Sequence, residues 1–213
     1  MTNEIKSYTH IALVLDASGS MDHLRSATID SMKAFFESLK SPEDKTVIDL
    51  WQFDDRVRHL IDGVELEKGA GQAIENYTTG GCTALHDAIC IGIDELGAKF
   101  AVMREEERPD AVVFAILTDG FENASQRFTV KDVKARIRHQ SEKYSWNFRF
   151  LAANQDAVLT GSEMGLEARS CEVMRASVEG LADASRRMVA MCCESRVLAR
   201  RSRQARKAKG SRV

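Results

Sequence analysis

The sequence predicts an α/β fold of the three-layer, doubly wound, Rossmann-like type, in which helices cover both faces of a mostly parallel sheet. Two observations lead to this prediction. Apolar runs such as 11–15 and 111–117 are typical of strands buried on both faces, and segments with helical spacing lie between such runs. Strands that alternate with helices pair in parallel through right-handed crossovers, which defines this fold class.

The first half of the chain predicts two strands, a helix and an edge hairpin. Residues 11–15 form the first apolar run, and apolar side chains then recur at helical spacing over 32–39, until a Ser-Pro pair stops the helix. Residues 46–53 alternate in the manner of a strand. After a turn of two aspartates, residues 57–66 predict one antiparallel edge strand.

The second half repeats the alternation. Over 85–103 the apolar residues are spaced three or four apart and make one helical stripe. A strand over 111–117, an amphipathic helix over 129–144 and a strand over 147–152 follow. Residues 161–174 are less regular and predict a short helix with an edge strand.

The C-terminal part differs in charge from the rest. We expect a last helix over about 176–195, because Val178, Leu181, Met188 and Cys192 share one helical face. Eight of the 30 basic residues and none of the 32 acidic ones follow position 195, so the preceding body carries a net charge near −10. We therefore predict one domain over 1–195 and a basic, disordered tail over 196–213.

Length and composition place the chain among ordinary globular proteins. Its 213 residues fit about one domain, and 44% are hydrophobic. The N-terminus carries no secretory signal pattern, and no apolar run approaches the ~18 residues that suggest a membrane span. The five cysteines are odd in number and lack metal-ligand spacing, which favours reduced thiols. We expect a cytoplasmic protein without a membrane segment.

Carboxylate and hydroxyl side chains follow the predicted strands. The segment Asp16-Ala17-Ser18-Gly19-Ser20 ends the first strand and can aim three oxygens at one point. Thr83 precedes the central helix, and Asp119 ends the strand after it. The carboxyl ends of parallel strands lie on one sheet edge, where ligands bind, and Mg²⁺ prefers oxygen ligands. We expect a metal site made of Asp16, Ser18, Ser20, Thr83 and Asp119.

These residues resemble the metal-ion-dependent adhesion site of the von Willebrand factor type A family, which is also known from integrin I domains. The family pattern is D-x-S-x-S, then a Thr, then an Asp, and the chain matches it at all five positions. The strings GGCTALHDAI, LTDGFENAS and FLAANQDA look more specifically like stand-alone members from bacteria and phages. The likeness covers roughly residues 8–165.

The resemblance implies a role for each residue. Ser18, Ser20 and Thr83 would bind the metal through their hydroxyls, and Asp16 and Asp119 would act largely through bound waters. The ion would be Mg²⁺, although Mn²⁺ also suits an all-oxygen site. Neutral hydroxyls leave most of the 2+ charge uncancelled, so the natural further ligand is an Asp or Glu carboxylate of a partner protein. In the family, the residues equivalent to Thr83 and Asp119 exchange direct contact with the metal as affinity changes.

Further polar residues fall on the same sheet edge. They form either a rim that contacts the partner or solvated and hydrogen-bonded loop positions: Asp54, Asp55, Glu122, Asn123, Asn154 and Asp156.

Simpler interpretations exist for several of these positions. Ser20 and Thr83 are also favourable helix caps, and Asp119-Gly120 is also a turn sequence. The adjacent pair His86-Asp87 suits core packing or helix-terminus electrostatics better than acid–base catalysis, because neighbouring helix residues do not face each other. Cys82 is either a redox-sensitive thiol or a small loop residue.

Three functions remain compatible with these patterns. The leading hypothesis is a non-enzymatic, Mg²⁺-dependent protein-binding module. A metal-assisted hydrolase of phosphoesters or peptides is the alternative, although G-x-S-x-G, H-E-x-x-H and P-loop strings are absent. The third is a scaffold whose tail, Arg196–Val213, binds nucleic acid or an acidic partner, although this tail has no aromatic residues for stacking on bases.

Overall fold

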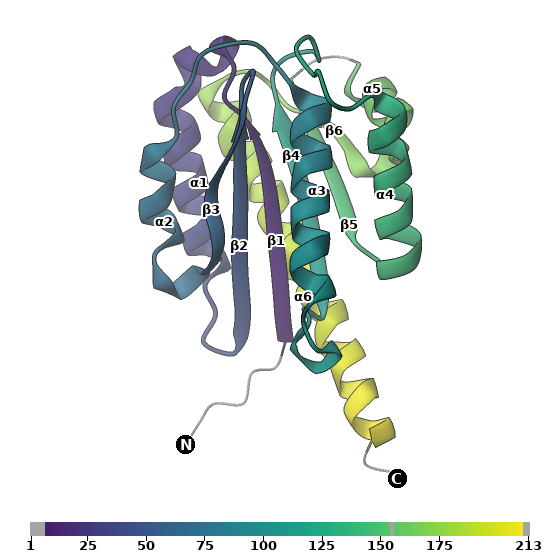
Figure 1. Cartoon of the computed structure of the whole chain (residues 1–213). Coiled ribbons are helices and arrows are strands. Elements are labelled where there is room, and N and C mark those ends of the chain that lie inside the picture. Colours follow the sequence, from purple (N-terminus) through teal and green to yellow (C-terminus); the bar gives the residue numbers. More distant parts are fainter. Residues whose placement is uncertain (1–6, 154–155, 211–213) are drawn as a thin grey trace.

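The computed structural model describes residues 7–153 and 156–210, the last six of them by backbone alone. A six-stranded sheet forms the middle layer, with strand order β3-β2-β1-β4-β5-β6 (Figure 1). All neighbouring strands are parallel except β2 and β3. The strands are β1 Ser7–Asp16, β2 Asp44–Phe53, β3 Val57–Glu65, β4 Ala111–Thr118, β5 Asn147–Ala152 and β6 Cys171–Val173. The predicted fold class and its antiparallel edge strand are confirmed.

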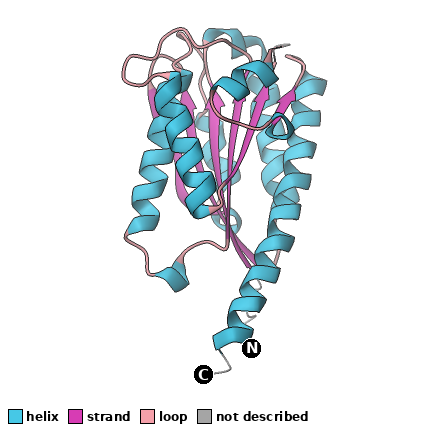
Figure 2. Ribbon diagram, turned by 90° about the vertical axis from the view of Figure 1, so that its right-hand side faces the viewer, coloured by secondary structure: helices cyan, strands magenta, loops and turns pink. Residues whose placement is uncertain are grey.

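Helices cover both faces of the sheet, as Figures 1 and 2 show. One face carries α1 and α6, and the other carries α3 and α4. The α-helices are α1 Arg25–Leu39, α2 Ala70–Ala73, α3 Leu85–Ala101, α4 Val130–Tyr144, α5 Ala157–Glu163 and α6 Val178–Gly210. Short 3-10 helices span Gly19–Leu24, Leu66–Lys68, Ile74–Asn76, Glu105–Glu107 and Ala168–Ser170.

The central strand explains why its sequence is apolar without interruption. Ile11, Leu13 and Leu15 pack into the core under α1 and α6, and Ala12 and Val14 pack into the core under α3 and α4. Successive side chains of a strand point to opposite faces, so both faces of β1 need apolar residues. All five side chains are buried.

The carboxyl ends of β1 and β4 lie where the order in which the chain adds strands to the sheet changes direction. From β1 the chain first moves to β2 on one side and later to β4 on the other side. In open α/β sheets such a switch point opens a crevice at the carboxyl ends of the strands. Asp16 ends β1, and Asp119 follows β4, so both acids lie at this crevice.

The prediction of a disordered tail from residue 196 is wrong, because α6 continues to Gly210 as one helix. Arg196 is buried and donates to the carbonyl of Leu39. Arg200 donates through Nε to Asp44 Oδ1 at 3.0 Å, and Arg203 reaches Asp110 Oδ2 at 3.0 Å. The basic residues are thus partly neutralised by acids of the body, which holds the helix beyond its apolar part. Residues 211–213 lie outside the described residues.

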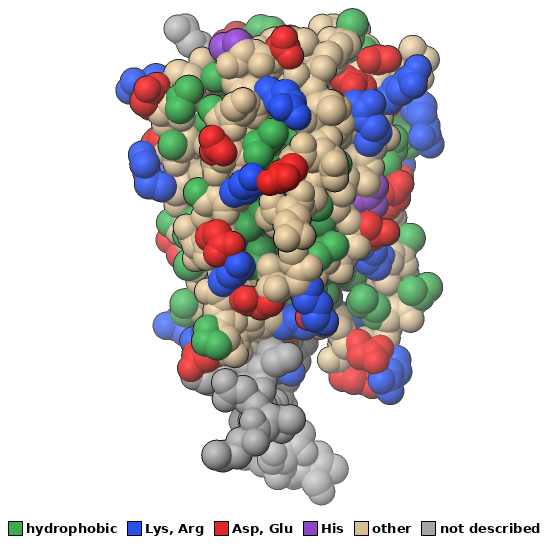
Figure 3. Space-filling model, turned by 90° about the vertical axis from the view of Figure 1, so that its left-hand side faces the viewer, with side chains coloured by type: hydrophobic (Ala, Val, Ile, Leu, Met, Phe, Trp, Pro, Cys, Tyr) green, Lys and Arg blue, Asp and Glu red, His purple; other side chains and the backbone are tan. Residues whose placement is uncertain are grey.

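The surface does not segregate charge on the side that Figure 3 presents. Acidic and basic side chains are interspersed there. None of the helices in the described part of the chain combines the length and apolar character that a membrane crossing would need.

Candidate metal site

Asp16 is fixed at the end of β1 by three hydrogen bonds. Its Oδ1 accepts from the backbone N–H of Ser18 at 2.8 Å, and its Oδ2 accepts from Thr118 Oγ1 at 2.5 Å. The hydroxyl of Tyr77 donates to the Asp16 carbonyl. Because Asp16 has no exposed surface, these contacts determine where its carboxylate points.

The two serines connect this loop to the loop after β4. Ser18 Oγ lies 3.0 Å from Ser20 Oγ, and Ser20 donates to Asp119 Oδ1 at 2.6 Å. The backbone N–H of Met21 bonds to the Ser18 carbonyl at 3.0 Å and starts the short 3-10 helix. No side-chain cap bond closes that helix, so the oxygens of both serines remain directed at the acids.

Thr83 joins the same group from a third loop. It is 4% exposed, and a Cβ added to Gly120 would lie 3.0 Å from its Oγ1 and 3.6 Å from Asp16 Oδ2. Residue 120 therefore passes so close to both oxygens that a side chain there would crowd them. The Thr83 N–H donates to Asn123 Oδ1 at 2.9 Å, and the Asn123 N–H donates to the Thr83 carbonyl at 3.0 Å. These bonds hold the Thr83 loop against the Asp119 loop.

The five predicted side chains thus gather at one end of the sheet with an excess of negative charge. Burial raises the pKa of Asp16; the hydrogen bonds from Ser18 and Thr118 oppose this effect, and the nearby Asp119 adds to it. Within residues 7–153 and 156–204, no Lys or Arg forms an ion pair with either acid. Two carboxylates and three hydroxyls without a counter-ion are a donor set that fits a hard divalent cation.

Two of the predicted rim residues, Glu122 and Asn123, make hydrogen bonds that connect neighbouring loops. Glu122 accepts from the His86 N–H at 2.9 Å and from the Ser125 N–H at 2.7 Å, which connects the loop after β4 to the first turn of α3. Burial alone would raise the pKa of Glu122, but these hydrogen bonds outweigh it and lower the pKa. Asn123 holds Thr83, as described above. Both residues therefore make the loop hydrogen bonds offered as their alternative role, and their contact with a partner stays a prediction.

The other rim residues vary in exposure. Asp54 is buried and accepts from the Arg56 N–H at 2.7 Å, whereas Asp55 is exposed and its carboxylate lies against Gly81. Asp156 is exposed at the N-terminus of α5. Asn154 lies outside the described residues.

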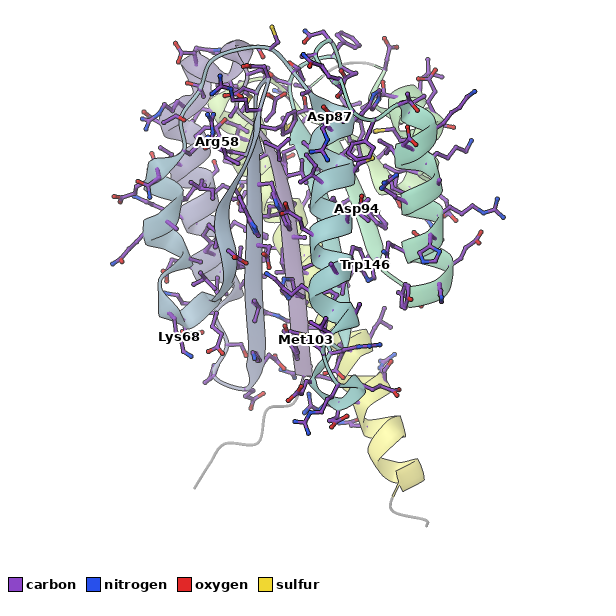
Figure 4. The ribbon with its side chains drawn as sticks, viewed as in Figure 1. Arg58, Lys68, Asp87, Asp94, Met103 and Trp146 are labelled. Carbon is purple, nitrogen blue, oxygen red and sulfur yellow. The ribbon has the colours of Figure 1, made fainter. Side chains whose placement is uncertain are left out.

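Three further residues support this site. Thr118 and Tyr77 position Asp16, and Asp87 accepts the backbone N–H groups of Gln126 at 3.0 Å and Phe128 at 2.9 Å. Asp87 lies near the N-terminal end of α3 (Figure 4), so its role is the helix-terminus electrostatics that the sequence offers for it. Thr118 and Tyr77 are not predicted from the sequence, and only Thr118 has a sequence signal, because it directly precedes Asp119. Cys82 is exposed beside Thr83.

The fold and this group of oxygens define a metal-dependent adhesion or binding module. The sequence profile described as von Willebrand factor type A domain matches residues 10–161, so the chain belongs to this family. No curated protein matches the chain.

Solved structures of low sequence identity share the fold. Proximal thread matrix protein 1 from the mussel byssus, with a zinc-occupied MIDAS motif, has 19% identity and a TM-score of 0.65 over 89% of this chain and 47% of its own. The von Willebrand factor type A protein from Catenulispora acidiphila has 18% identity and a TM-score of 0.62 over 86% and 42%. The domain of the pili tip protein Mfa5 from Porphyromonas gingivalis has 11% identity and a TM-score of 0.63 over 87% and 95%. The chain spans about half the length of the first two proteins.

Proposed function

We propose that this chain is a non-enzymatic protein-binding module that captures an Asp or Glu carboxylate of a partner through a bound Mg²⁺ ion. One observation carries the proposal: two carboxylates and three hydroxyls gather at the switch point of the sheet, and no described basic side chain neutralises them. The family supports a metal-dependent binding role, and the partner and the metal are our own assignment.

The charges of the five side chains indicate which of them would bind the ion directly and which through water. Ser18, Ser20 and Thr83 would hold the ion through neutral oxygens, and Asp16 and Asp119 would act through its bound waters. A bound Mg²⁺ supplies a positive charge that attracts an anionic ligand. Since Asp16 is buried and its carboxylate is already committed to Ser18 and Thr118, it neutralises the ion only from a distance. The remaining positive charge favours a carboxylate from outside.

The choice of Mg²⁺ rests on the donor atoms. All the candidate ligands are oxygens, which suit Mg²⁺ and Mn²⁺ better than softer metals. The mussel protein holds zinc in its MIDAS motif, so Zn²⁺ is the competitor against which the choice of Mg²⁺ must be tested. Competition experiments with Mg²⁺, Mn²⁺ and Zn²⁺ on the isolated chain would rank the three ions by affinity.

Affinity capture from the native cell tests the proposal. The bait is the chain in Mg²⁺ or in a chelator, with Asp119→Ala as the loss variant and Asp30→Ala, an exposed acid of α1 outside the site and its rim, as the matched control. We expect a partner that binds in Mg²⁺ to the unmodified chain and to Asp30→Ala only. A partner retained in chelator or by Asp119→Ala would contradict a metal-bridged contact.

The absence of catalysis needs its own measurement. Glu122 is engaged with the N–H groups of His86 and Ser125, so it is unsuited to act as a general base. We expect no Mg²⁺-dependent hydrolysis of generic phosphoesters or peptides. Hydrolysis that disappears in Ser18→Ala would establish an enzyme instead.

A further inference from the structure

A second group of polar side chains lies inside the face of the sheet that α3 covers. Asp49, in the middle of β2, has no exposed surface. Its Oδ1 lies 2.8 Å from Lys99 Nζ and 2.7 Å from His59 Nε2, and its Oδ2 lies 2.6 Å from His10 Nε2. Lys99 also contacts Asp62 Oδ1 at 2.7 Å. We name Asp49, His59, Asp62 and Lys99 the β2–β3 cluster.

A β-bulge brings the two carboxylates of the cluster together. The register of β2 against β3 shifts between Ile48 and Leu50, so that Asp49 stands opposite two residues, Asp62 and Gly63. Gly63 has a φ of 61°, a conformation that favours glycine. Bulges redirect side chains and are frequent beside functional sites. Here the bulge sets a second acid beside a buried one.

The histidine of the cluster is held by a further layer of side chains. Its ring stacks on Trp51, with centroids 4.2 Å apart and an interplanar angle of 16°. His59 Nδ1 lies 3.6 Å from Glu95 Oε2, which accepts from Trp51 Nε1 at 2.7 Å. His59 Nε2 is buried and, although close to Asp49, makes no hydrogen bond of regular geometry. Metal-binding histidines are commonly oriented by a carboxylate next to the ring nitrogen that does not bind the metal. Glu95 has this position at His59 Nδ1, which leaves Nε2 directed at Asp49.

The charges of this region favour a further positive charge. Two carboxylates, Asp49 and Asp62, contact the ammonium of Lys99, and a third, that of Glu95, lies behind His59. Burial raises the pKa of Asp49, but the hydrogen bonds from His10 and Lys99 and the close approach of His59 outweigh it and hold the pKa well below its usual range. The Asp49 carboxylate is therefore ionised, as a metal ligand must be.

We propose that Asp49, His59 and Asp62 form a second metal site that is selective for a borderline divalent ion such as Zn²⁺. The ion enters this site by displacing the ammonium of Lys99. The ligand atoms of the three residues lie within 4.8 Å of one another. One imidazole nitrogen and two carboxylate oxygens suit Zn²⁺, whereas Mg²⁺ prefers oxygen alone. Lys99 is 29% exposed and Asp62 71% exposed, so both side chains have room to rearrange at the surface.

Zinc titration of the full chain tests the proposal, by calorimetry and by Co²⁺ absorption. We name the candidate site of Asp16, Ser18, Ser20, Thr83 and Asp119 the metal edge, and all measurements use an Asp119→Ala background, which disables it. We expect one Zn²⁺ to bind per chain at this site. Its affinity should fall by more than about tenfold in His59→Ala and by about tenfold in Glu95→Gln. His139→Ala is the matched control, since His139 is an exposed histidine of α4, and it should leave the affinity unchanged.

The lysine provides an independent check. Lys99→Met removes the resident ammonium, so Zn²⁺ should bind this variant more tightly and raise its Tm more than it raises that of the unmodified chain. The proposal is overturned if the Asp119→Ala chain binds no Zn²⁺, if His59→Ala and His139→Ala bind it equally, or if Zn²⁺ leaves the Tm of Lys99→Met unchanged. Because no partner protein and no Mg²⁺ are involved, the result is independent of the proposed function.

Discussion

The metal edge and the β2–β3 cluster each contain two acids, but only the cluster supplies its own cation. Asp16 and Asp119 are surrounded by hydroxyls, and burial raises the pKa of Asp16. Asp49 and Asp62 share Lys99, and the donors around Asp49 hold its pKa low. The acids of the cluster are thus already paired with a cation of the fold, whereas those of the edge have no described basic partner, and we propose that they take a cation from outside.

Removing the buried acid of the cluster should have the largest effect on stability. Asp49→Ala leaves His10 and Lys99 without their common partner, so we expect the free energy of unfolding to fall by about 3 to 5 kcal/mol. Urea denaturation measures the change. Asp62→Ala, at an exposed position, should cost less than about 1 kcal/mol. Equal losses in both variants would show that burial of Asp49 is not what matters.

At the metal edge, the hydroxyl of Thr118 donates the hydrogen bond that positions Asp16 Oδ2. Thr118→Val leaves Asp16 Oδ2 without its donor, so we expect a loss of about 1 to 3 kcal/mol in unfolding free energy together with weaker Mg²⁺ binding. Thr118→Ser keeps the hydroxyl and should retain both properties. If Val and Ser behave alike, the hydroxyl does not position the carboxylate.

Acidification should lower the stability of the fold through His10, the buried histidine that contacts Asp49 of the β2–β3 cluster. Burial lowers the pKa of His10 below 6.5, an effect that the hydrogen bond to Asp49 opposes and the charges of Lys99 and Lys45 reinforce. The unfolded chain therefore takes up the proton first, so the contribution of neutral His10 is full above pH 6.5 and is lost as the pH falls below it. Stability should decline by at most about 1.4 kcal/mol per pH unit there.

Urea midpoints between pH 7.5 and 5 measure this slope. His10→Gln should flatten it, whereas His139→Gln should not. A slope that is unchanged in His10→Gln would place the titrating group elsewhere. The contribution of Asp49, whose pKa is lowered, is full above pH 3.8 and is lost only below it.

The smallest effect concerns the predicted binding of nucleic acid by the basic C-terminus. Truncation after Gln204 removes four basic residues but keeps Arg196, Arg200 and Arg203, which contact the body. If the segment binds DNA, the slope of log affinity against log salt should become less steep by about 0.9 for each phosphate that the removed residues neutralise. An unchanged slope would end this hypothesis.

The sequence predicted the fold and the metal edge because both depend on local patterns. The apolar run 11–15 is typical of a strand buried on both faces, and the residues of the edge directly follow strands or precede a helix. Thr83 and Asp119 are far from Asp16 in sequence, but parallel strands bring their ends together. The metal role of these residues stays a prediction.

Contacts between distant segments account for what the sequence did not predict. Arg200 pairs with Asp44 and Arg203 with Asp110, and neither pairing follows from composition, so the sequence predicts a tail where the structure has a helix. The sequence leaves Glu122 open between a partner contact and a loop hydrogen bond, because no spacing reveals that its carboxylate accepts backbone N–H groups. The β2–β3 cluster depends on a bulge, which the alternation of residues 46–53 does not reveal.

Stabilisation by Mg²⁺ tests most directly whether the metal edge requires an external cation. The measurement is the free energy of unfolding of the chain with and without saturating Mg²⁺, compared with that of Asp119→Ala. At a concentration about 100 times Kd, we expect Mg²⁺ to raise the free energy of unfolding by about 2.7 kcal/mol in the unmodified chain and to have no effect in the variant. No gain in the unmodified chain, or the same gain in Asp119→Ala, would contradict the account.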